Sequence, residues 1–190
     1  IPRQLWITGA QIQFVNAPSN QRERVEIQEF FLGVSADRTT SQIEALAQFH
    51  GVPIHVRGGL GDMTLWAEGN LESVSLQYTA GDIRGELSGE IADIFDEGRV
   101  DLHYTARGDR FNTVGQLLDL DLDYDLGVTP FLFGAKLQGN WQDISLTHAV
   151  GTIGSQGIQI DMAGEARDLF RRNDLEFDLR ARSDALDDLM

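Results

Sequence analysis

The stretch GIQIDMAGEARDLFRRNDLEFDLRARSDALDDLM, residues 157–190, shows how this chain is built. Apolar and polar residues alternate along most of it, which predicts two β-strands, and the closing SDALDDLM predicts the start of a helix. An earlier copy, IRGELSGEIADIFDEGRVDLHYTARGDRFNTVG at 83–115, aligns with 158–190 without a gap, at an offset of 75 residues. The identical pairs are Ile83/Ile158, Gly89/Gly164, Glu90/Glu165, Asp93/Asp168, Phe95/Phe170, Ala106/Ala181, Arg107/Arg182 and Asp109/Asp184. We therefore expect a β-rich repeat protein rather than an enzyme with a single active site.

A second similarity extends the repeat toward the N-terminus. GNLESVSL at 69–76 resembles GNWQDISL at 139–146, here at an offset of 70 residues. The second copy therefore holds five more residues, which we expect in its hairpin, HAVGTIGSQG at 148–157.

The composition allows one domain with a sizeable core. Of the 190 residues, 42% are hydrophobic, which is slightly low for a compact globule. Several of the 20 glycines fall inside strand patterns and predict bulges and bends. The chain has no cysteine, which excludes disulfides, cysteine-ligated metals and thiol nucleophiles and leaves the compartment open.

The formal net charge of −15 predicts repulsion from nucleic acid and from anionic membrane surfaces. A lipid partner would therefore be held by apolar surface and not by a basic patch. The alternative interpretation is a soluble, self-repelling outer face that has no partner.

The sequence shows no targeting or membrane-spanning segment. Its apolar runs stay below the roughly 18 residues of a transmembrane helix. Residues 1–20 lack the basic and apolar regions of a signal peptide. Because the chain begins close to a strand and stops inside a helix start, we interpret it as an excised part of a longer protein.

Alternation predicts about eleven strands along the chain. The strand patterns cover 5–15, 25–36, 41–50, 54–60, 72–79, 83–93, 99–107, 131–139, 143–153 and two stretches within 157–190, and a further short run at 64–69 is taken with the strands. In the first strand the apolar phase slips by one residue at Gly9, and in the second it slips after Ile27. Such slips are typical of β-bulges.

Three segments need a choice between structures. SQIEALAQFH at 41–50 has the composition of a helix, but its strict alternation favours a strand. Residues 109–118 favour a helix, because Asp109 is a plausible N-cap and the apolar residues after it have helical spacing. Residues 119–129, DLDLDYDLGVT, alternate Asp with Leu or Tyr.

The alternation gives the predicted sheet one apolar face along its whole length and one charged face. The charged face would carry Glu86, Glu90, Asp101, Asp161, Glu165, Glu176, Asp178 and Arg180. A sheet this long needs something against its apolar face, either a second sheet, a helix or a ligand. One full helix is too little to cover it.

Three runs of the chain carry a resemblance to a known family. They are GDRFNTVGQLLDLDL at 108–122, TPFLFGAKLQGNWQDISLTHAVGTIGSQGIQIDMAGEARD at 129–168 and NDLEFDLRARSDALDDLM at 173–190. Together they resemble the repeat of AsmA-like proteins, in which a short helix, a PF-x-L strand, a glycine-bearing hairpin and a leucine-rich ending recur in order. The matching positions are Pro130, Phe131, Gly151, Gly154, Gly157, Leu175, Leu179, Ser183, Leu186 and Leu189. Residues 1–16 and 45–62 also look like earlier strands of that family.

The resemblance implies a repeating β-groove of the bridge-like lipid-transfer class. This is a mainly β fold, a long curved antiparallel sheet that forms an open trough with an apolar concave face, with one or two short helices between β modules. Residues 1–190 would form a single segment with modules near 1–63, 64–118 and 119–190. The implied role is transport of phospholipid acyl chains through the Gram-negative periplasm, in a protein anchored in the inner membrane that reaches toward the outer membrane and supports its biogenesis.

An apolar strand face can line a lipid groove, because each buried CH2 contributes about 0.8 kcal/mol and a continuous apolar surface has no single deep trap. The candidate lining residues are Ile54, Val56, Val74, Leu76, Ile83, Leu87, Val100, Leu102, Tyr104, Phe131, Phe133, Ile144, Leu146, Ile158, Ile160, Met162, Leu175, Phe177 and Leu179. The alternative is an ordinary sandwich core, since alternation says only that one face is buried.

Catalytic and metal motifs are weak. Asp119, Asp121, Asp123 and Asp125 lack the glycine and the closing glutamate of a calcium loop, and the four histidines lack metal spacing. Glu90 and Asp93 recur as a carboxylate pair in the second copy, and duplicated turn roles explain this better than a duplicated active site. We expect no enzyme and no cofactor.

Three functional hypotheses follow. The first is a lipid-conducting groove that binds phospholipids, meets envelope membranes at the two ends of the full-length protein and binds no nucleic acid. The second is a non-catalytic structural or adhesive β-sandwich or solenoid of the cell envelope. The third is a carbohydrate-active enzyme. In every case the end strands are expected to be unpaired, so the chain can also associate edge to edge.

Overall fold

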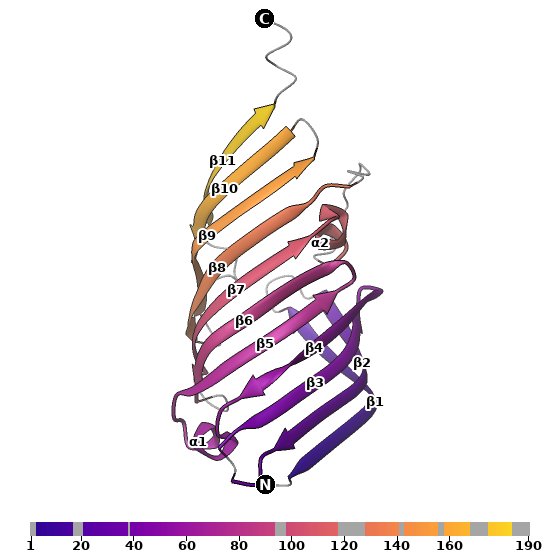
Figure 1. Ribbon diagram of the computed structural model, residues 1–190, viewed down its shortest axis with the longest axis vertical. Coiled ribbons are helices and arrows are strands. Elements are labelled where there is room, and N and C mark those ends of the chain that lie inside the picture. Colours follow the sequence, from indigo (N-terminus) through magenta and orange to yellow (C-terminus); the bar gives the residue numbers. More distant parts are fainter. Residues whose placement is uncertain are drawn as a thin grey trace, which may run out of the picture.

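The protein is one curved antiparallel sheet, seen in a computed structural model that describes residues 3–16, 21–37, 39–93, 98–117, 128–140, 143–155, 158–167 and 175–183 (Figure 1). The strands are β1 (Gln4–Asn16), β2 (Gln21–Val34), β3 (Ser41–Phe49), β4 (Val52–Leu60), β5 (Glu72–Ala80), β6 (Ile83–Ala92), β7 (Arg99–Gly108), β8 (Phe131–Asn140), β9 (Asp143–Ser155), β10 (Ile158–Ala166) and β11 (Leu175–Ser183). Two short helices, α1 (Met63–Ala67) and α2 (Phe111–Leu117), interrupt them. All eleven strands pair in chain order, so β1 and β11 form the two edges of the sheet.

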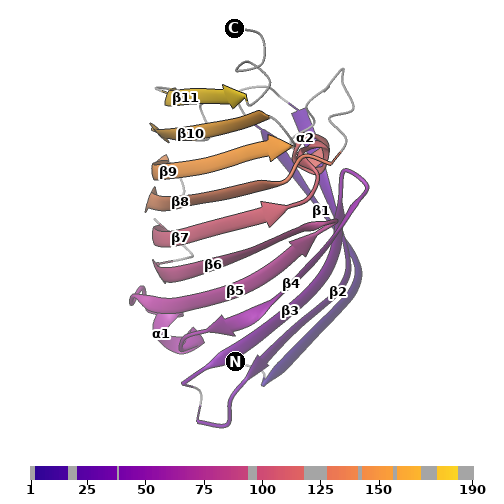
Figure 2. The ribbon, with the colours of Figure 1, turned by 45° about the horizontal axis from the view of Figure 1, so that its top comes forward.

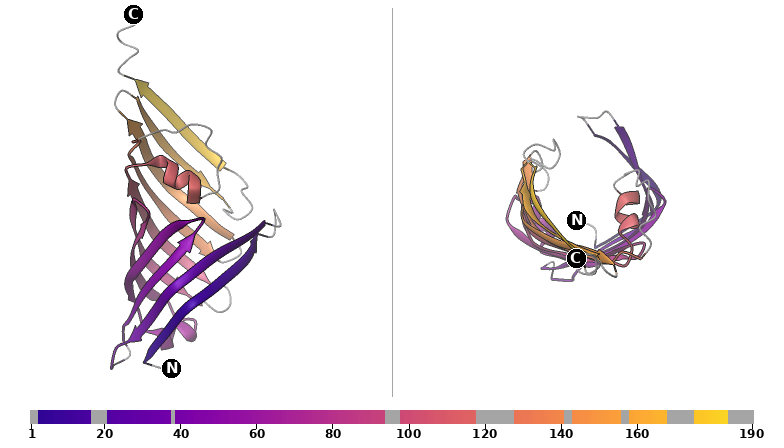
Figure 3. Two further views of the ribbon diagram at one scale, coloured as in Figure 1. Left: turned by 90° about the vertical axis from the view of Figure 1, so that its right-hand side faces the viewer. Right: turned by 90° about the horizontal axis from the view of Figure 1, so that it is seen from above.

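The sheet bends into an open trough, which is clearest in the view along its length (Figure 3). Helix α2 lies inside the bend and packs on the apolar cluster around Val52, Ala80 and Ile83. The apolar face of the sheet is therefore its concave face, and the charged face is convex. This confirms the predicted fold class.

The sequence repeat is also a repeat of strand register. In the pairing of β6 with β7, Gly89 lies opposite Leu102, and in that of β10 with β11, Gly164 lies opposite Phe177. Both residue numbers are raised by 75, the offset seen in the sequence. The same alternation of apolar residues therefore produces the same strand pair twice.

The two predicted phase slips lie side by side. β2 shifts register against β3 between Ile27 and Glu29, as expected for a bulge. Gly9 of β1 lies next to this point and has a φ of 64°, a conformation that glycine adopts without a steric penalty. Because β1 and β2 change phase together, Leu5, Ile7, Ala10 and Ile12 stay on the concave face.

The segment expected as a strand at 64–69 is a helix, so that prediction was wrong. Asp62 caps α1 through its Oδ1 atom, which accepts hydrogen bonds from the backbone N–H groups of Thr64 at 2.7 Å and Leu65 at 3.4 Å. The run of Met, Thr, Leu, Trp and Ala then suits a helix once its first N–H groups are satisfied. Local alternation in so short a run could not reveal the cap.

Two further predicted elements are confirmed, and the position of the five extra residues differs from the prediction. Residues 41–50 contain strand β3, and the helix expected at 109–118 is α2. The five extra residues of the second copy lengthen β9, which runs to Ser155, instead of forming a hairpin loop. Of the acidic run predicted at 119–129, residues 119–127 lie outside the described residues.

Candidate functional site

The concave face consists of apolar side chains that line up in rows along the trough, across the strands. The strand registers place seventeen of the nineteen candidate lining residues on this face. The side chains of Ile158 and Leu175 are not among those that the structure describes. The remaining candidates differ in how far the two helices cover them.

Helix α1 covers the row at one margin of the trough (Figure 2). Trp66 is 7% exposed and packs with Leu60, Val74, Val100 and Leu102. Its indole Nε1–H donates to the carbonyl oxygen of Ile91 at 2.7 Å, which ties the helix to the end of β6. At this margin the apolar face is buried by the protein itself.

Helix α2 covers the row at the opposite margin. Phe111 contacts Phe131 edge to face, with ring centroids 5.9 Å apart. The Thr113 hydroxyl donates to the Asp82 carboxylate, and Gln116 Nε2 donates to the carbonyl oxygen of His50 at 3.0 Å. These polar bonds hold α2 over the β3–β4 and β5–β6 hairpins.

Between the covered margins runs a strip that we call the median lane. It consists of Val56, Leu76, Tyr78, Leu87, Tyr104, Phe133, Met162, Phe177 and Leu179. The first seven side chains are half-buried, whereas Phe177 is 38% exposed and Leu179 is 66% exposed. At the other end of the trough, Leu5, Ile7 and Ile12 of β1 are 37–50% exposed on the same face. Apolar surface therefore remains open along the trough and at both of its ends.

Glycines on the concave face leave room for the large side chains of the paired strands. The Cα partners are Gly58 with Leu76, Gly85 with Tyr78, Gly108 with Phe131 and Gly164 with Phe177. At Gly85, Gly108 and Gly164 an added Cβ would collide with the side chain of the partner, whereas at Gly58 it would collide with the backbone of β5. The large side chain therefore lies flat over the neighbouring strand instead of projecting into the trough.

One polar pair lies within this apolar surface. The Tyr78 hydroxyl donates to the Tyr104 hydroxyl at 2.6 Å, and the two rings are nearly parallel, with centroids 6.0 Å apart. Burial, together with the hydrogen bond to Tyr104, raises the pKa of Tyr78 well above the ordinary tyrosine value. Tyr78 was not among the predicted lining residues. Its alternation with Val74 and Leu76 along β5 is the sequence signal that could have identified it.

The convex face carries the charges expected of it. Lys136 Nζ lies 3.0 Å from Asp101 Oδ1, and Gln138 Nε2 donates to Asp101 Oδ2 at 3.0 Å. The hydrogen bond from Lys136 is the main cause that lowers the pKa of the Asp101 carboxyl. Since this pair is only partly buried and remains in contact with solvent, it contributes about 1 kcal/mol or less to stability.

Other candidate chemistry does not assemble into a site. Glu90 is exposed on the convex face, and Asp93 follows β6 with a φ of 54°. Of their second copies, Glu165 is exposed, and Asp168 lies outside the described residues. Within the described ranges, no three His, Asp or Glu side chains group as metal ligands would, and neither helix is long and apolar enough to cross a membrane.

No protein-family model, curated protein or solved structure matches this chain. The geometry of the trough is therefore the basis for assigning a function.

Proposed function

We propose that the concave face binds phospholipid acyl chains and conducts them along the trough. The observation that carries this proposal is an apolar concave face that belongs to one open sheet and stays accessible along the median lane and at both ends. Among the described strands there is no second sheet to close over it. The sandwich core considered as an alternative therefore has no support in this part of the chain.

The length of the trough suits an acyl chain that slides along it. Eleven strands spaced about 4.8 Å apart make a trough about 50 Å long, whereas one leaflet of a bilayer core is about 15 Å thick. Each CH2 group buried in the lane contributes about 0.8 kcal/mol, and the contribution is similar at successive strands. An acyl chain can therefore move along the lane without leaving apolar surface, while its headgroup stays in water at the margin.

The wider setting belongs to the same proposal. The resemblance to AsmA-like proteins favours a periplasmic segment of a longer protein that is tethered to the inner membrane and reaches toward the outer membrane. Its partners would be phospholipids and, for the full-length protein, the two envelope membranes. A net charge of −15 disfavours nucleic acid as a partner, and we propose a non-catalytic, cofactor-free role.

Lipid occupancy can be tested on protein purified without detergent. Native mass spectrometry should detect copurified phospholipid, and delipidated protein should take up a radiolabelled phospholipid. A photo-crosslinking amino acid at Phe133, on the concave face, should capture that lipid. The same residue at Val150, which is 58% exposed on the convex face, should not.

The competing hypothesis is a structural module of the envelope. It gains some support from the clusters that α1 and α2 bury on the concave face. A delipidated protein that takes up no lipid, with no difference in crosslinking between positions 133 and 150, would favour that hypothesis and reject lipid conduction.

A further inference from the structure

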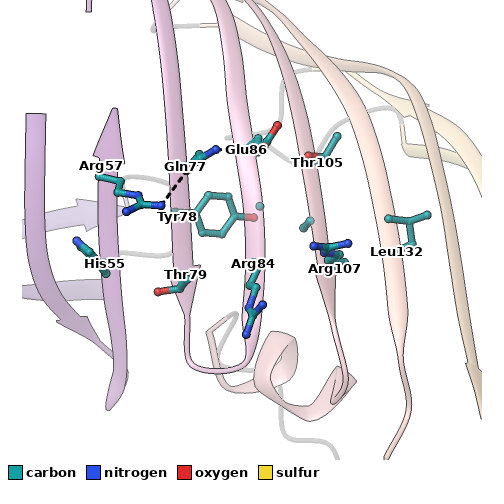
Figure 4. Close-up of a pocket in the computed structure, with 12 residues that line it drawn as sticks. His55, Arg57, Gln77, Tyr78, Thr79, Arg84, Glu86, Thr105, Arg107 and Leu132 are labelled. Carbon is teal, nitrogen blue, oxygen red and sulfur yellow. Dashed lines mark hydrogen bonds between the residues drawn. The ribbon is translucent and has the colours of Figure 1, made fainter. Parts of the chain in front are cut away.

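The convex face contains a depression of about 780 Å³ over β4 to β8, lined by charged and apolar residues (Figure 4). Its lining includes His55, Arg57, Arg84, Arg107, Glu86 and Thr79. Three arginines and one glutamate thus meet in one place, in a chain that has 30 acidic and only 15 basic residues. The depression is a local positive region on an acidic protein.

Arg84 and Arg107 are direct cross-strand partners in the pairing of β6 with β7. Like charges directly opposite each other in a sheet are destabilising. Both side chains are exposed, and in the described part of the chain no carboxylate lies within ion-pair distance of either guanidinium. This arginine pair therefore has no anion of its own.

The neighbouring charged groups are already engaged. Arg57 donates to Gln77 Oε1 at 3.4 Å, and Gln77 Nε2 donates to Glu86 Oε1 at 3.4 Å. Glu44 accepts from His55 at 3.0 Å. The two free guanidinium groups are thus flanked by side chains that contact one another, and Glu86 is the one carboxylate in the lining of the depression.

Hydroxyl groups lie beside the arginine pair. Thr79 is the Cα partner of Arg84 on one side, and Thr105 is the Cα partner of Glu86, one row away. Hydroxyl groups next to arginine guanidinium groups can donate further hydrogen bonds to the oxygens of an anion that the arginines bind.

We propose that Arg84 and Arg107, assisted by Thr79 and Thr105, bind a phosphate group on the convex face. Each guanidinium presents a fork of N–H donors that matches two oxygens. A tetrahedral phosphate can satisfy two such forks at once, whereas a carboxylate satisfies one. The phosphate would also neutralise the repulsion between the two arginines. This site is independent of lipid conduction on the concave face.

The phosphate could come from a soluble phosphate compound or from a phospholipid headgroup. Arg84 is the second residue of β6 and Arg107 the second-last residue of β7, so both lie next to the margin of the trough. A headgroup at that margin and a free phosphate would present the same chemistry to the site.

The test is a titration with inorganic phosphate at constant ionic strength, with binding followed by calorimetry and by thermal unfolding. We expect saturable binding to the wild type and at least tenfold weaker binding to the Arg84→Gln and Arg107→Gln variants. Arg99→Gln removes an exposed arginine at the far end of β7 and should bind like the wild type. Glu86→Gln removes the one carboxylate of the depression and should bind about fivefold more tightly.

Two results would overturn the proposal. One is phosphate binding that Arg84→Gln and Arg107→Gln leave unchanged. The other is equal stabilisation by chloride, which would show simple screening. Without phosphate, Arg84→Gln should unfold at the wild-type temperature or above it, so loss of binding is separated from loss of fold. A short-chain phospholipid that binds more tightly than inorganic phosphate, and depends on Arg84, would support a headgroup; weaker binding would support a soluble phosphate compound.

Discussion

Gly85 illustrates how single residues shape the trough. An alanine Cβ at this position would collide with the Tyr78 side chain and with the carbonyl oxygen of Thr105. The backbone oxygen cannot move away without disturbing the pairing of β6 with β7. Glycine here is therefore required by space and not by turn geometry.

We predict that Gly85→Ala destabilises the protein by about 1–3 kcal/mol, the usual effect of overpacking. Gly59→Ala is the control, because its added Cβ would meet only the Ser41 carbonyl oxygen, at 3.9 Å. Urea unfolding of the two variants measures the difference. Equal stability of both would show that the flat packing of Tyr78 is unimportant.

The tyrosine pair predicts a loss of stability at high pH. The pKa of Tyr78 is raised in the folded state, so its hydroxyl stays protonated while the unfolded chain ionises above about pH 10. Stability contributed by Tyr78 is therefore present below about pH 10 and is lost as the pH rises beyond it. Tyr78→Phe should cost about 1 kcal/mol near neutral pH through the lost hydrogen bond, yet should lose less stability above pH 10.

Urea unfolding between about pH 8 and pH 11 measures this effect across the ordinary tyrosine pKa of about 10. Tyr104→Phe is the comparison, because it keeps the buried Tyr78 hydroxyl and should keep most of the pH dependence. The same change of unfolding free energy with pH in the wild type and in Tyr78→Phe would contradict the prediction.

Among the elements, the two edge strands differ in how they are protected. β11 carries Glu176, Asp178, Arg180 and Arg182, and charges of this kind discourage pairing with another chain. The thirteen residues of β1 include no charged residue, and Trp6 is 62% exposed on the convex face. β1 is therefore the edge that is open to edge-to-edge association.

We predict that two copies associate through antiparallel β1 strands, centred between Thr8 and Gly9. In this register Leu5 would face Ile12 of the second copy and Ile7 would face Ala10, so the concave faces would be continuous. The chain has no cysteine, so the double variant Trp6→Cys/Gln11→Cys should form a disulfide-linked dimer under mild oxidation without background. Thr8→Lys should shift the protein to monomer in light scattering. Absence of crosslinking at concentrations where dimer is measured would exclude this register, and a monomer at all concentrations would exclude the association.

The whole trough acts as one apolar surface, so a charge in its median lane should impair it along its length. We predict that Leu87→Glu lowers the amount of copurified phospholipid at least severalfold, because an acyl chain cannot pass a carboxylate without losing apolar contact. Ser88→Glu places the same charge on the next residue of β6, which is exposed on the convex face, and should leave lipid content unchanged. Circular dichroism of both variants checks that the sheet is retained.

An equal loss of lipid in Leu87→Glu and Ser88→Glu would mean that the concave face is not the lipid path. An unchanged content in both would mean that the copurified lipid does not occupy the median lane.

Local pattern was sufficient for much of the fold. Alternation assigns Leu87 and Ser88 to opposite faces, and the repeat of Gly89 and Leu102 as Gly164 and Phe177 carries the strand register with it. These features depend on neighbours two residues apart along a strand or directly across a hairpin, so short-range sequence patterns are enough to predict them. The same reading missed α1, because a single capping carboxylate at Asp62 outweighed the alternation of a short run.

The sequence alone determined that one face of a long antiparallel sheet is apolar and that the strand pairs repeat, because side-chain direction follows a period of two. The family resemblance, and not the strand pattern, predicted that this face is concave. Only the tertiary structure decided that α1 and α2 cover its margins and that Arg84 and Arg107 share a depression on the other side. The reason is physical. The direction of bending and the seat of each helix depend on the summed packing of many strands, such as Tyr78 lying over Gly85, and no short stretch contains that sum.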